Sequence, residues 1–286
     1  MTEATLDILM ITWNRPRYTA MALEQLLDTC EPGMRVWIWH NGNDAETLKV
    51  VESFEGHPHL GRIHVSAENK KLREPTNWFW HESKAQFLSK VDDDCLLPVG
   101  WGSALIDAHR KSPTLGIIGC WRFDEQDFDP KLAAPKMCDL PGGHGIMRNC
   151  SVQGSGYVMK RAVVEQLGPL GPAESFPAYC IRAASAGWVN GWHFPFLHEE
   201  HMDDPRSPYS ELKSEEDFRR NRPLTAINFK VETLEEWKEH VRWMARCDQT
   251  APYDPRRLRG WQARLRGTLF RLEVLAGLRE PWRFRC

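Results

Sequence analysis

Short apolar runs alternate with amphipathic helical stretches through the first two thirds of the chain, and this alternation constrains the fold more than any other feature. The apolar runs have the length of buried strands, and apolar residues recur between them at the three-to-four spacing of helices. A helical stretch from about Pro75 to Lys90 precedes a further strand that ends in three acids. The other strands are expected at 6–12, 35–40, 62–65, 116–121, 152–159 and 188–196. Repeated strand–helix units predict an α/β fold with a mostly parallel sheet flanked by helices.

Polar clusters follow three of these strands at their carboxyl ends. Thr12–Arg15 follows the first strand, His40–Asn43 the second, and Asp92–Asp94 the acidic one. Parallel strands end at the same edge of a sheet, and open α/β sheets bind their ligands in a crevice at that edge. The three clusters are therefore expected to converge on one site.

Three adjacent carboxylates, those of Asp92, Asp93 and Asp94, end the acidic strand. Carboxylates so close together either have raised pKa values or bind a cation. Mg²⁺ or Mn²⁺ is commonly held by one or two carboxylates together with the phosphates of a substrate. A solvated acidic turn is the alternative, because aspartate is common in turns.

The composition is that of a globular protein and argues against several classes of partner. The 286 residues are 42% hydrophobic and 27% charged, and the net charge of −2 gives no sign of nucleic-acid binding. The chain contains no run of about 18 apolar residues, and its N-terminus lacks the pattern of a signal peptide. Eight scattered cysteines without a CxxC pair are typical of a reducing compartment, so a cytoplasmic location is expected.

The pattern changes after residue 204. Residues 1–204 carry the strand–helix alternation, and 205–286 are expected to form a helical C-terminal extension that packs on them. The last segment, Asp254–Cys286, holds nine arginines against three acids and has an apolar stripe. A basic amphipathic helix of this kind can lie on an anionic membrane surface or grip a partner. A packed helix with a solvated basic face is the alternative.

The order of these motifs resembles the family-2-like glycosyltransferases of the GT-A fold over roughly residues 6–204. The segments that carry the resemblance are Ile11–Pro16, His40–Asp44, Glu68–Leu72 with Asn77, Asp92–Asp94, Gly154–Tyr157, Lys160-Arg161, Leu167-Gly168, Arg182 with Ala186–Trp188, and His198. The resemblance implies transfer of a sugar from a nucleoside-diphosphate sugar to a glycan, lipid-linked or peptide acceptor. It also implies Mn²⁺ or Mg²⁺ as cofactor, since the leaving diphosphate needs a Lewis acid.

The resemblance also assigns roles to individual residues. It places the nucleotide sugar on Thr12, Asn14, Arg15, Asn41, Asn69, Asn77, Asp92 and Asp93. It places the metal ion on Asp94 and His198. Helix capping is the alternative role for Asn69 and Asn77, and a loop histidine without a ligand is the alternative for His198.

Two departures from the family pattern affect these assignments. His40-Asn41 stands where the family usually has an acid after the second strand. The usual Glu-Asp pair before a late helix is replaced by Ser175-Phe176, which leaves Glu174 as the expected catalytic base of an inverting transfer. A position just before a helix N-terminus stabilises the anionic form of such a carboxylate. A retaining mechanism without a base is one alternative, and another is a carboxylate from the long loop predicted over 122–149, namely Asp124, Glu125, Asp127 or Asp129.

Three other functions compete with glycosyl transfer. A nucleotidyltransferase of the same fold would carry a glycine-rich phosphate loop after the first strand, and Thr12–Pro16 contains no glycine. A non-catalytic domain that binds nucleotides or carbohydrates would fit the missing Glu-Asp pair. A zinc hydrolase is disfavoured, because the histidines of His198-Glu199-Glu200-His201 do not have the HExxH spacing.

Overall fold

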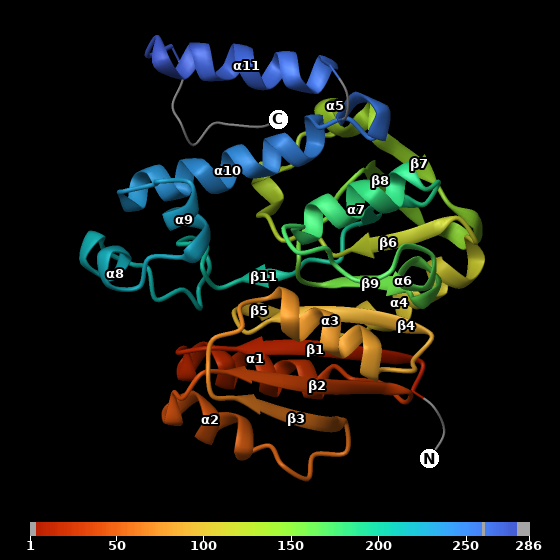
Figure 1. The fold of residues 1–286 in the computed structure, drawn as a ribbon, viewed down its shortest axis with the longest axis vertical. Helices are drawn as coiled ribbons and strands as arrows, with labels where there is room; N and C mark the ends of the chain where they lie inside the picture. Colours follow the sequence, from red (N-terminus) through yellow and green to blue (C-terminus); the bar gives the residue numbers. More distant parts are fainter. Residues whose placement is uncertain (1–3, 259–260, 279–286) are drawn as a thin grey trace. The chain divides into compact units, whose positions relative to one another are not determined.

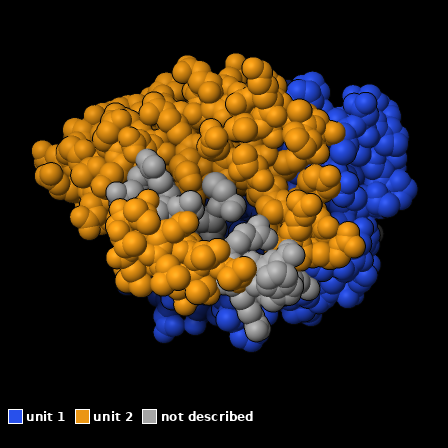
Figure 2. All heavy atoms as spheres, turned by 90° about the horizontal axis from the view of Figure 1, so that it is seen from above, with its two compact units in different colours: residues 1–121, 138–199 blue, residues 122–137, 200–286 orange. Residues whose placement is uncertain are grey.

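The computed structural model describes residues 4–258 and 261–278 (Figure 1). The chain forms two compact units (Figure 2). Unit 1 comprises residues 1–121 and 138–199, and unit 2 comprises residues 122–137 and 200–286. The chain passes into unit 2 after Glu199. No pattern in the sequence indicates that residues 122–137 belong with the C-terminal unit.

A nine-stranded sheet organises unit 1, in the order β3-β2-β1-β4-β9-β6-β10-β8-β7 (Figure 1). Its strands are β1 (Leu6–Thr12), β2 (Met34–Asn41), β3 (Leu60–Ser66), β4 (Phe87–Asp92), β6 (Leu115–Gly119), β7 (Met137–Asp139), β8 (Gly145–Asn149), β9 (Tyr157–Lys160) and β10 (Val189–Phe194). The first four strands pair in parallel, as do β6 and β10. Strand β9 runs antiparallel to both β4 and β6, and β8 runs antiparallel to β10. The predicted α/β class with a mostly parallel sheet is confirmed.

The carboxyl ends of the first four strands lie in register. Thr12 stands beside His40, His40 beside Val65, and Ile11 beside Asp92. The polar clusters that follow β1, β2 and β4 therefore meet at one edge of the sheet, and their predicted convergence is confirmed.

The helical stretch expected from Pro75 to Lys90 is only half right. Helix α3 (Arg73–Glu82) ends early, and Phe87–Lys90 belongs to β4. Strand β4 is central, between β1 and β9, and residues 87–91 are buried on both faces. A strand covered on both faces shows a continuous apolar run rather than alternation. The sequence pattern at the start of β4 therefore predicts a continuation of the preceding helix.

Helices flank the sheet of unit 1. They are α1 (Pro16–Asp28), α2 (Ala45–Glu52), α3, α4 (Trp101–Lys111), α6 (Arg161–Leu167) and α7 (Phe176–Ser185), and a short strand β5 (Cys95–Leu96) precedes α4. Helix α1 packs beside α2, α4 against β6 and β9, and α7 against β6 and β10. Asp44 caps α2 by accepting the backbone N–H groups of Glu46 and Thr47. Asn14 does not cap α1, because its backbone is left-handed (φ 53°) and Arg15 occupies the cap position.

The segment 122–149 is more regular than the long loop that was predicted. It contains the short helices η1 (Glu125–Asp127), α5 (Pro130–Ala133), η2 (Ala134–Lys136) and η3 (Pro141–Gly143), together with β7 and β8. Strand β8 pairs with β10 from Gly145 beside Phe194 to Asn149 beside Asn190. Its residues are mostly buried without alternation, so the sequence carried no period-2 signal for a strand.

Unit 2 is mainly helical, as predicted from Pro205 onward. It contains β11 (Glu200–His201), α8 (Glu215–Arg220), α9 (Leu224–Asn228), α10 (Leu234–Thr250), η4 (Pro255–Leu258) and α11 (Trp261–Leu275). Helix α10 begins with a capping box formed by Thr233 and Glu236 and packs against α5. Arg206 binds the carboxylates of both Asp127 and Asp204, so an ion-pair network joins 122–137 to the rest of this unit.

The basic C-terminal segment is described only in part. Leu265, Leu269, Leu272 and Leu275 of α11 are all exposed, between 49% and 84%. The positions 259–260 and 279–286, which carry several of the arginines, lie outside the described residues. Over the described ranges, no helix is both long and apolar enough to cross a bilayer. Cys30, Cys95, Cys120 and Cys180 are free thiols, whereas Cys247 is disulfide-bonded.

Candidate active site

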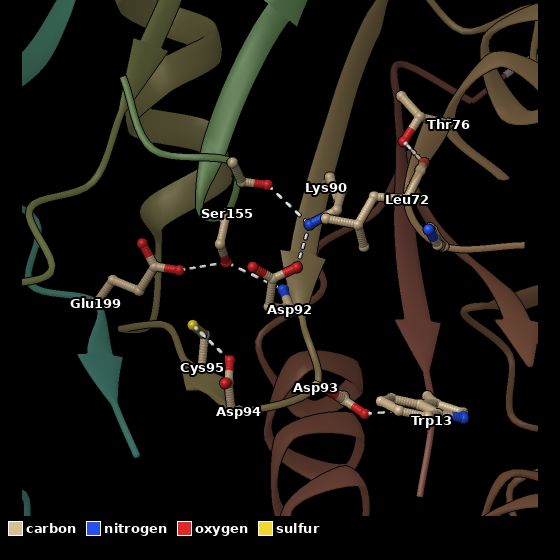
Figure 3. A network of polar contacts seen from close by, with 12 residues as sticks. Trp13, Leu72, Thr76, Lys90, Asp92, Asp93, Asp94, Cys95, Ser155 and Glu199 are labelled. Carbon is tan, nitrogen blue, oxygen red and sulfur yellow. Dashed lines mark hydrogen bonds and ion pairs between the residues drawn. The ribbon is translucent and has the colours of Figure 1, made fainter. Parts of the chain in front are cut away.

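The carboxyl edge of β1, β2 and β4 brings the acidic motif beside the first two loops. Asp93 is the inward-facing member of the motif and is buried. Its Oδ2 accepts the backbone N–H of Trp13 at 3.3 Å (Figure 3). The same oxygen accepts the hydroxyl of Thr19 at 3.1 Å. Burial, followed by repulsion from Asp94, raises the pKa of Asp93 to about 7. Asp93 therefore ties the acidic motif to the first loop and to α1.

Asp94 forms an ion pair with the first loop. Its Oδ2 lies 2.8 Å from Nη1 of Arg15, and the two side chains are 12% and 28% exposed. Its Oδ1 lies 3.4 Å from the thiol of Cys95. The structure thus brings together one residue assigned to the nucleotide and one assigned to the metal ion.

Asp92 is the most open of the three acids, with a side chain 38% exposed. Its carboxylate is paired with the buried ammonium of Lys90, which also donates to the carbonyl oxygen of Gly154 at 2.9 Å. The backbone N–H of Asp92 donates to the hydroxyl oxygen of Ser155 at 3.0 Å. Two links therefore join the end of β4 to the turn that precedes β9 (Figure 3).

A fourth carboxylate, Glu199, lies behind the acidic motif and was not singled out from the sequence. It is fully buried, and it accepts hydrogen bonds from the hydroxyl of Ser155 and the side-chain amide of Gln153. A Cβ at Gly156, whose φ is +59°, would collide with the Glu199 carboxylate. The sequence of His198-Glu199-Glu200-His201 does not indicate that Glu199 is buried while its neighbour His198 is exposed.

The polar residues at the ends of β1 and β2 build the wall of the site. Thr12 and His40 are buried, and Oγ1 of Thr12 lies 3.0 Å from Nδ1 of His40. Burial lowers the pKa of His40, so its imidazole is neutral near pH 7. The side chain of Asn41 accepts the backbone N–H of Lys70 at 2.9 Å and donates to the carbonyl of Lys71 at 3.1 Å. Asn41 therefore pins the loop after β3 against the end of β2.

Exposed residues line the open side of the same edge. Asn14 and Asn69 are exposed, and Trp13 is 47% exposed. A Cβ at Gly42 would lie 3.8 Å from the indole ring of Trp13, so the ring lies over the second loop. Asn69 accepts the backbone N–H of Lys71, which stabilises a turn rather than a helix start. Trp13 is a further candidate site residue, and an exposed tryptophan directly after a buried strand is the sequence signal that could have identified it.

Asn77 and Glu174 both hold the segment between α6 and α7. The Asn77 side chain donates to the Leu170 carbonyl at 3.0 Å and accepts the Leu170 backbone N–H at 2.9 Å. Glu174 accepts two hydrogen bonds from the Arg182 guanidinium, at 2.9 and 2.7 Å, and one from the Gly171 backbone. The carboxylate expected to act as base is thus held in a bidentate ion pair.

The remaining assigned residues lie in loops or in unit 2. His198 is exposed in the loop after β10, and its backbone bridges to Trp121. In unit 2, Asp124 and Asp129 cap short helices, and Asp127 is paired with Arg206. These carboxylates have structural bonds within their own unit.

Four carboxylates and two cations lie in or beside the acidic motif at the end of β4. The carboxylates are Asp92, Asp93, Asp94 and Glu199, and the cations are Lys90 and Arg15. The four carboxyl groups outnumber the two cations by two, and a proton on Asp93, whose pKa is raised to about 7, lowers the excess of negative charge by one. An excess of this size, with oxygen donors, suits one hard divalent cation.

Comparison with known proteins agrees with this arrangement. The model of the family described as glycosyl transferase family 2 matches residues 7–166, which is more than half of the chain. The chain belongs to glycosyl transferase family 2. The matched range includes the loops after β1 and β2 and the whole acidic motif. No curated protein matches the chain.

Two solved structures share the fold. The mannosyltransferase PcManGT from Pyrobaculum calidifontis, in complex with GDP-Man and Mn²⁺, is 16% identical with a TM-score of 0.59, and the match covers 99% of this chain and 83% of that one. Residues 1–349 of S. aureus TarS in complex with UDP-GlcNAc are 15% identical with a TM-score of 0.53, covering 92% and 78%. At such identities the likeness establishes the GT-A fold of this family 2 protein and leaves its substrates to other evidence.

Proposed function

We propose that this family 2 protein transfers a sugar from a nucleoside-diphosphate sugar to a saccharide, lipid-linked or peptide acceptor, with the assistance of a divalent metal ion. The observation that carries the proposal is the carboxylate cluster at the end of β4, which is ion-paired to the loop after β1 through Arg15. Family membership supports glycosyl transfer. The likeness to proteins in complex with GDP-Man and with UDP-GlcNAc supports a nucleotide-sugar donor.

A divalent cation fits the residues at this edge. The carboxyl groups of the acidic motif outnumber the cations beside them, and carboxylate oxygens suit Mg²⁺ and Mn²⁺. We assign Mn²⁺ or Mg²⁺ to Asp94 and His198, both of which lie in segments that follow strands of unit 1. When bound, the ion would offset the negative charge that develops on the departing diphosphate.

Arg15 is placed to exchange partners during binding. Its guanidinium lies 2.8 Å from Asp94, and a metal ion on that carboxylate would compete with the ion pair. A guanidinium released from a carboxylate can bind a diphosphate through two parallel hydrogen bonds. Arg15 would therefore neutralise Asp94 before the metal ion binds, and would hold the diphosphate of the donor afterwards.

The other nucleotide-binding residues divide into two groups by exposure. We propose that Asn14, Asn69 and the more open Asp92 contact the donor directly. The remaining assigned residues act by holding the loops, since their polar atoms bond the protein itself; they are Thr12, Asn41, Asn77 and Asp93. The half-exposed ring of Trp13 offers a flat face on which a base can stack.

Glu174 remains our proposed catalytic base, in an inverting transfer. The Arg182 guanidinium holds its carboxylate in place through two hydrogen bonds. Glu174→Gln should then lower kcat with little change in donor affinity. Retaining transfer is the alternative outcome, and anomer-specific NMR of the product distinguishes the two.

We further propose a cytoplasmic protein that contacts anionic membranes through its C-terminal segment. The exposed leucines of α11 and the net charge of +6 over Asp254–Cys286 support this contact. Flotation with vesicles that contain 30% phosphatidylserine tests it, with pure phosphatidylcholine as control. Binding should require the anionic lipid and should be lost when Leu265, Leu269 and Leu272 are all replaced by Gln.

Calorimetric titration with nucleotides tests the central proposal. UDP, GDP, dTDP and CMP are titrated with and without Mn²⁺ into wild type, Asp94→Ala, and the control Asp139→Ala, which changes an exposed aspartate of β7. One nucleotide should bind in a metal-dependent way to wild type and to the control, and lose that dependence in Asp94→Ala. Equal binding by all three proteins would refute the assignment of Asp94.

A further inference from the structure

We propose that Glu199 is a positioning residue for the acidic motif, acting through Ser155 on the carboxyl end of β4. The inference rests on the proposed function in one respect, namely that the acidic motif holds the metal ion. Glu199 itself reaches no exposed surface, since it is fully buried. Its influence on the site has to travel through the residues it bonds.

Three groups form a directed chain of hydrogen bonds. The backbone N–H of Asp92 donates to Oγ of Ser155 at 3.0 Å, so this hydroxyl oxygen already serves as an acceptor. The Ser155 hydroxyl hydrogen is then directed to Oε1 of Glu199. Figure 3 shows this chain running from Glu199 through Ser155 to Asp92. The Ser155 hydroxyl keeps this orientation only if residue 199 supplies an acceptor. The hydrogen bond that holds the Asp92 backbone depends on that orientation.

The second oxygen of Glu199 also faces a donor. Gln153 accepts the indole N–H of Trp192 through Oε1 at 2.5 Å, and its Nε2 donates to the backbone carbonyl of Cys120. These bonds fix the amide so that Nε2 also points at Oε2 of Glu199, at 3.0 Å. A carboxylate is acceptor-only, whereas a glutamine would present an amide donor to one of the two donors. The surroundings therefore favour a side chain whose two terminal atoms both accept hydrogen bonds at this position.

This arrangement is costly for the fold. Removing a carboxyl group from water is unfavourable, and among the described residues no lysine or arginine bonds to Glu199. Gly156 is also committed to it, because any Cβ there would meet the carboxylate. A neutral pair of side chains could fill the same space at lower cost. The gain lies in the location of Asp92, which both Ser155 and Lys90 hold to the turn before β9.

Glu199 thereby sets where the acidic motif stands. The backbone of Asp92 leads directly into Asp93 and Asp94, so a shift at the Asp92 amide moves both carboxylates that follow. Residues that orient metal ligands from behind affect metal affinity by about 10- to 100-fold when they are changed. We expect Glu199→Gln to weaken the binding of Mn²⁺ alone by at least about tenfold on the same grounds.

The experiment combines hydrogen exchange with metal binding. Wild type, Glu199→Gln, Ser155→Ala, their double variant, and the exposed control Glu165→Gln are compared. Amide exchange is measured by mass spectrometry on peptides that span 91–95, with peptides of β1 as internal reference. Binding of Mn²⁺ without nucleotide is measured by electron paramagnetic resonance.

Several outcomes support the inference. Glu199→Gln and Ser155→Ala should each speed exchange at residues 91–95 and weaken Mn²⁺ binding, while β1 and Glu165→Gln stay unchanged. The double variant should bind Mn²⁺ as weakly as Ser155→Ala alone, because Glu199 acts through that hydroxyl. A merely structural role predicts additive losses instead.

Other outcomes overturn it. Unchanged exchange at residues 91–95 in Glu199→Gln refutes the positioning role, and Ser155→Ala gives the same test if Glu199→Gln does not fold. Absence of Mn²⁺ binding in wild type would refute the metal assignment of the proposed function and not the inference. The exchange measurement decides on Glu199 in that case, since it requires no metal ion.

Discussion

His109 should make the stability of this protein strongly dependent on pH. It lies on α4 and is 1% exposed, with its ring 5.5 Å from that of Phe87. Its Nε2–H donates to the carbonyl oxygen of Val158 on β9 at 2.9 Å. Burial, helped by the nearby charge of Lys160, lowers the pKa of His109 from 6.5 to about 4. The folded protein therefore holds this imidazole neutral over a range in which the unfolded chain protonates it.

The size of the effect follows from the two pKa values. The unfolded state binds more protons between pH 6.5 and pH 4, so stability is fully present above pH 6.5 and falls as the pH decreases through this range. A difference of roughly 2.5 units corresponds to about 3.4 kcal/mol when protonation is complete in the unfolded state only. At pH 5 the same two values give a loss of about 2 kcal/mol.

Urea unfolding of wild type and His109→Gln between pH 7.5 and pH 5 measures this loss. A glutamine amide can keep the bond to Val158 but does not titrate, so it removes the pH-dependent contribution alone. The stability of the variant relative to wild type should rise by about 2 kcal/mol from pH 7.5 to pH 5. His81→Gln serves as control, because the His81 side chain is 83% exposed. Parallel curves for wild type and His109→Gln would refute the reasoning and mean that water reaches the buried ring.

Three further substitutions probe single bonds. Asp7→Asn should destabilise unit 1 by about 1 to 3 kcal/mol in urea unfolding, because buried Asp7 accepts two hydrogen bonds from Arg35 at 2.9 and 3.0 Å and the Arg35 side chain left behind is 37% exposed; a loss below about 0.5 kcal/mol would mean that the pair is solvated. Asn41→Ala should speed amide exchange at Lys70 and weaken nucleotide binding. Unchanged exchange would contradict the role of Asn41 in holding the loop after β3. Thr233→Ala should cost about 1 kcal/mol and Thr233→Ser much less, as judged by thermal melting of α10, because a hydroxyl caps that helix; equal losses would rule out the cap.

The sheet and the location of the site were predictable because they depend on local pattern. Runs such as Leu6–Thr12 contain their own strand signal, and the direction of parallel strands then places their polar ends together. The same pattern did not predict the start of β4, because burial on both faces removes the alternation that marks a strand. The membership of 122–137 in the C-terminal unit was not predictable for a different reason. Its partners, Arg206 and Gln249, lie more than 70 residues away along the chain.

Individual side chains of the site were less predictable than its position. The sequence indicated that Asn41 and Asp93 belong to the site, but not that their polar atoms bond backbone and hydroxyl groups of the protein. The sequence did not indicate Glu199, because nothing in the sequence around it distinguishes a buried glutamate from an exposed one. Its burial depends on Gly156 and Gln153, which are more than 40 positions distant in the chain.

The place of β9 between β4 and β6 has a consequence for how the protein is made. On the ribosome, β4 is complete at Asp92, but its neighbour β9 begins only at Tyr157, which is 65 residues later. At roughly 5 to 20 residues per second, the nascent chain carries β4 with one edge unpaired for about 3 to 13 seconds. An unpaired edge recruits other strands, so this interval is the period of greatest risk for aggregation. Slower translation just after Asp92 should therefore lower the soluble yield, whereas slower translation after Lys160 should not.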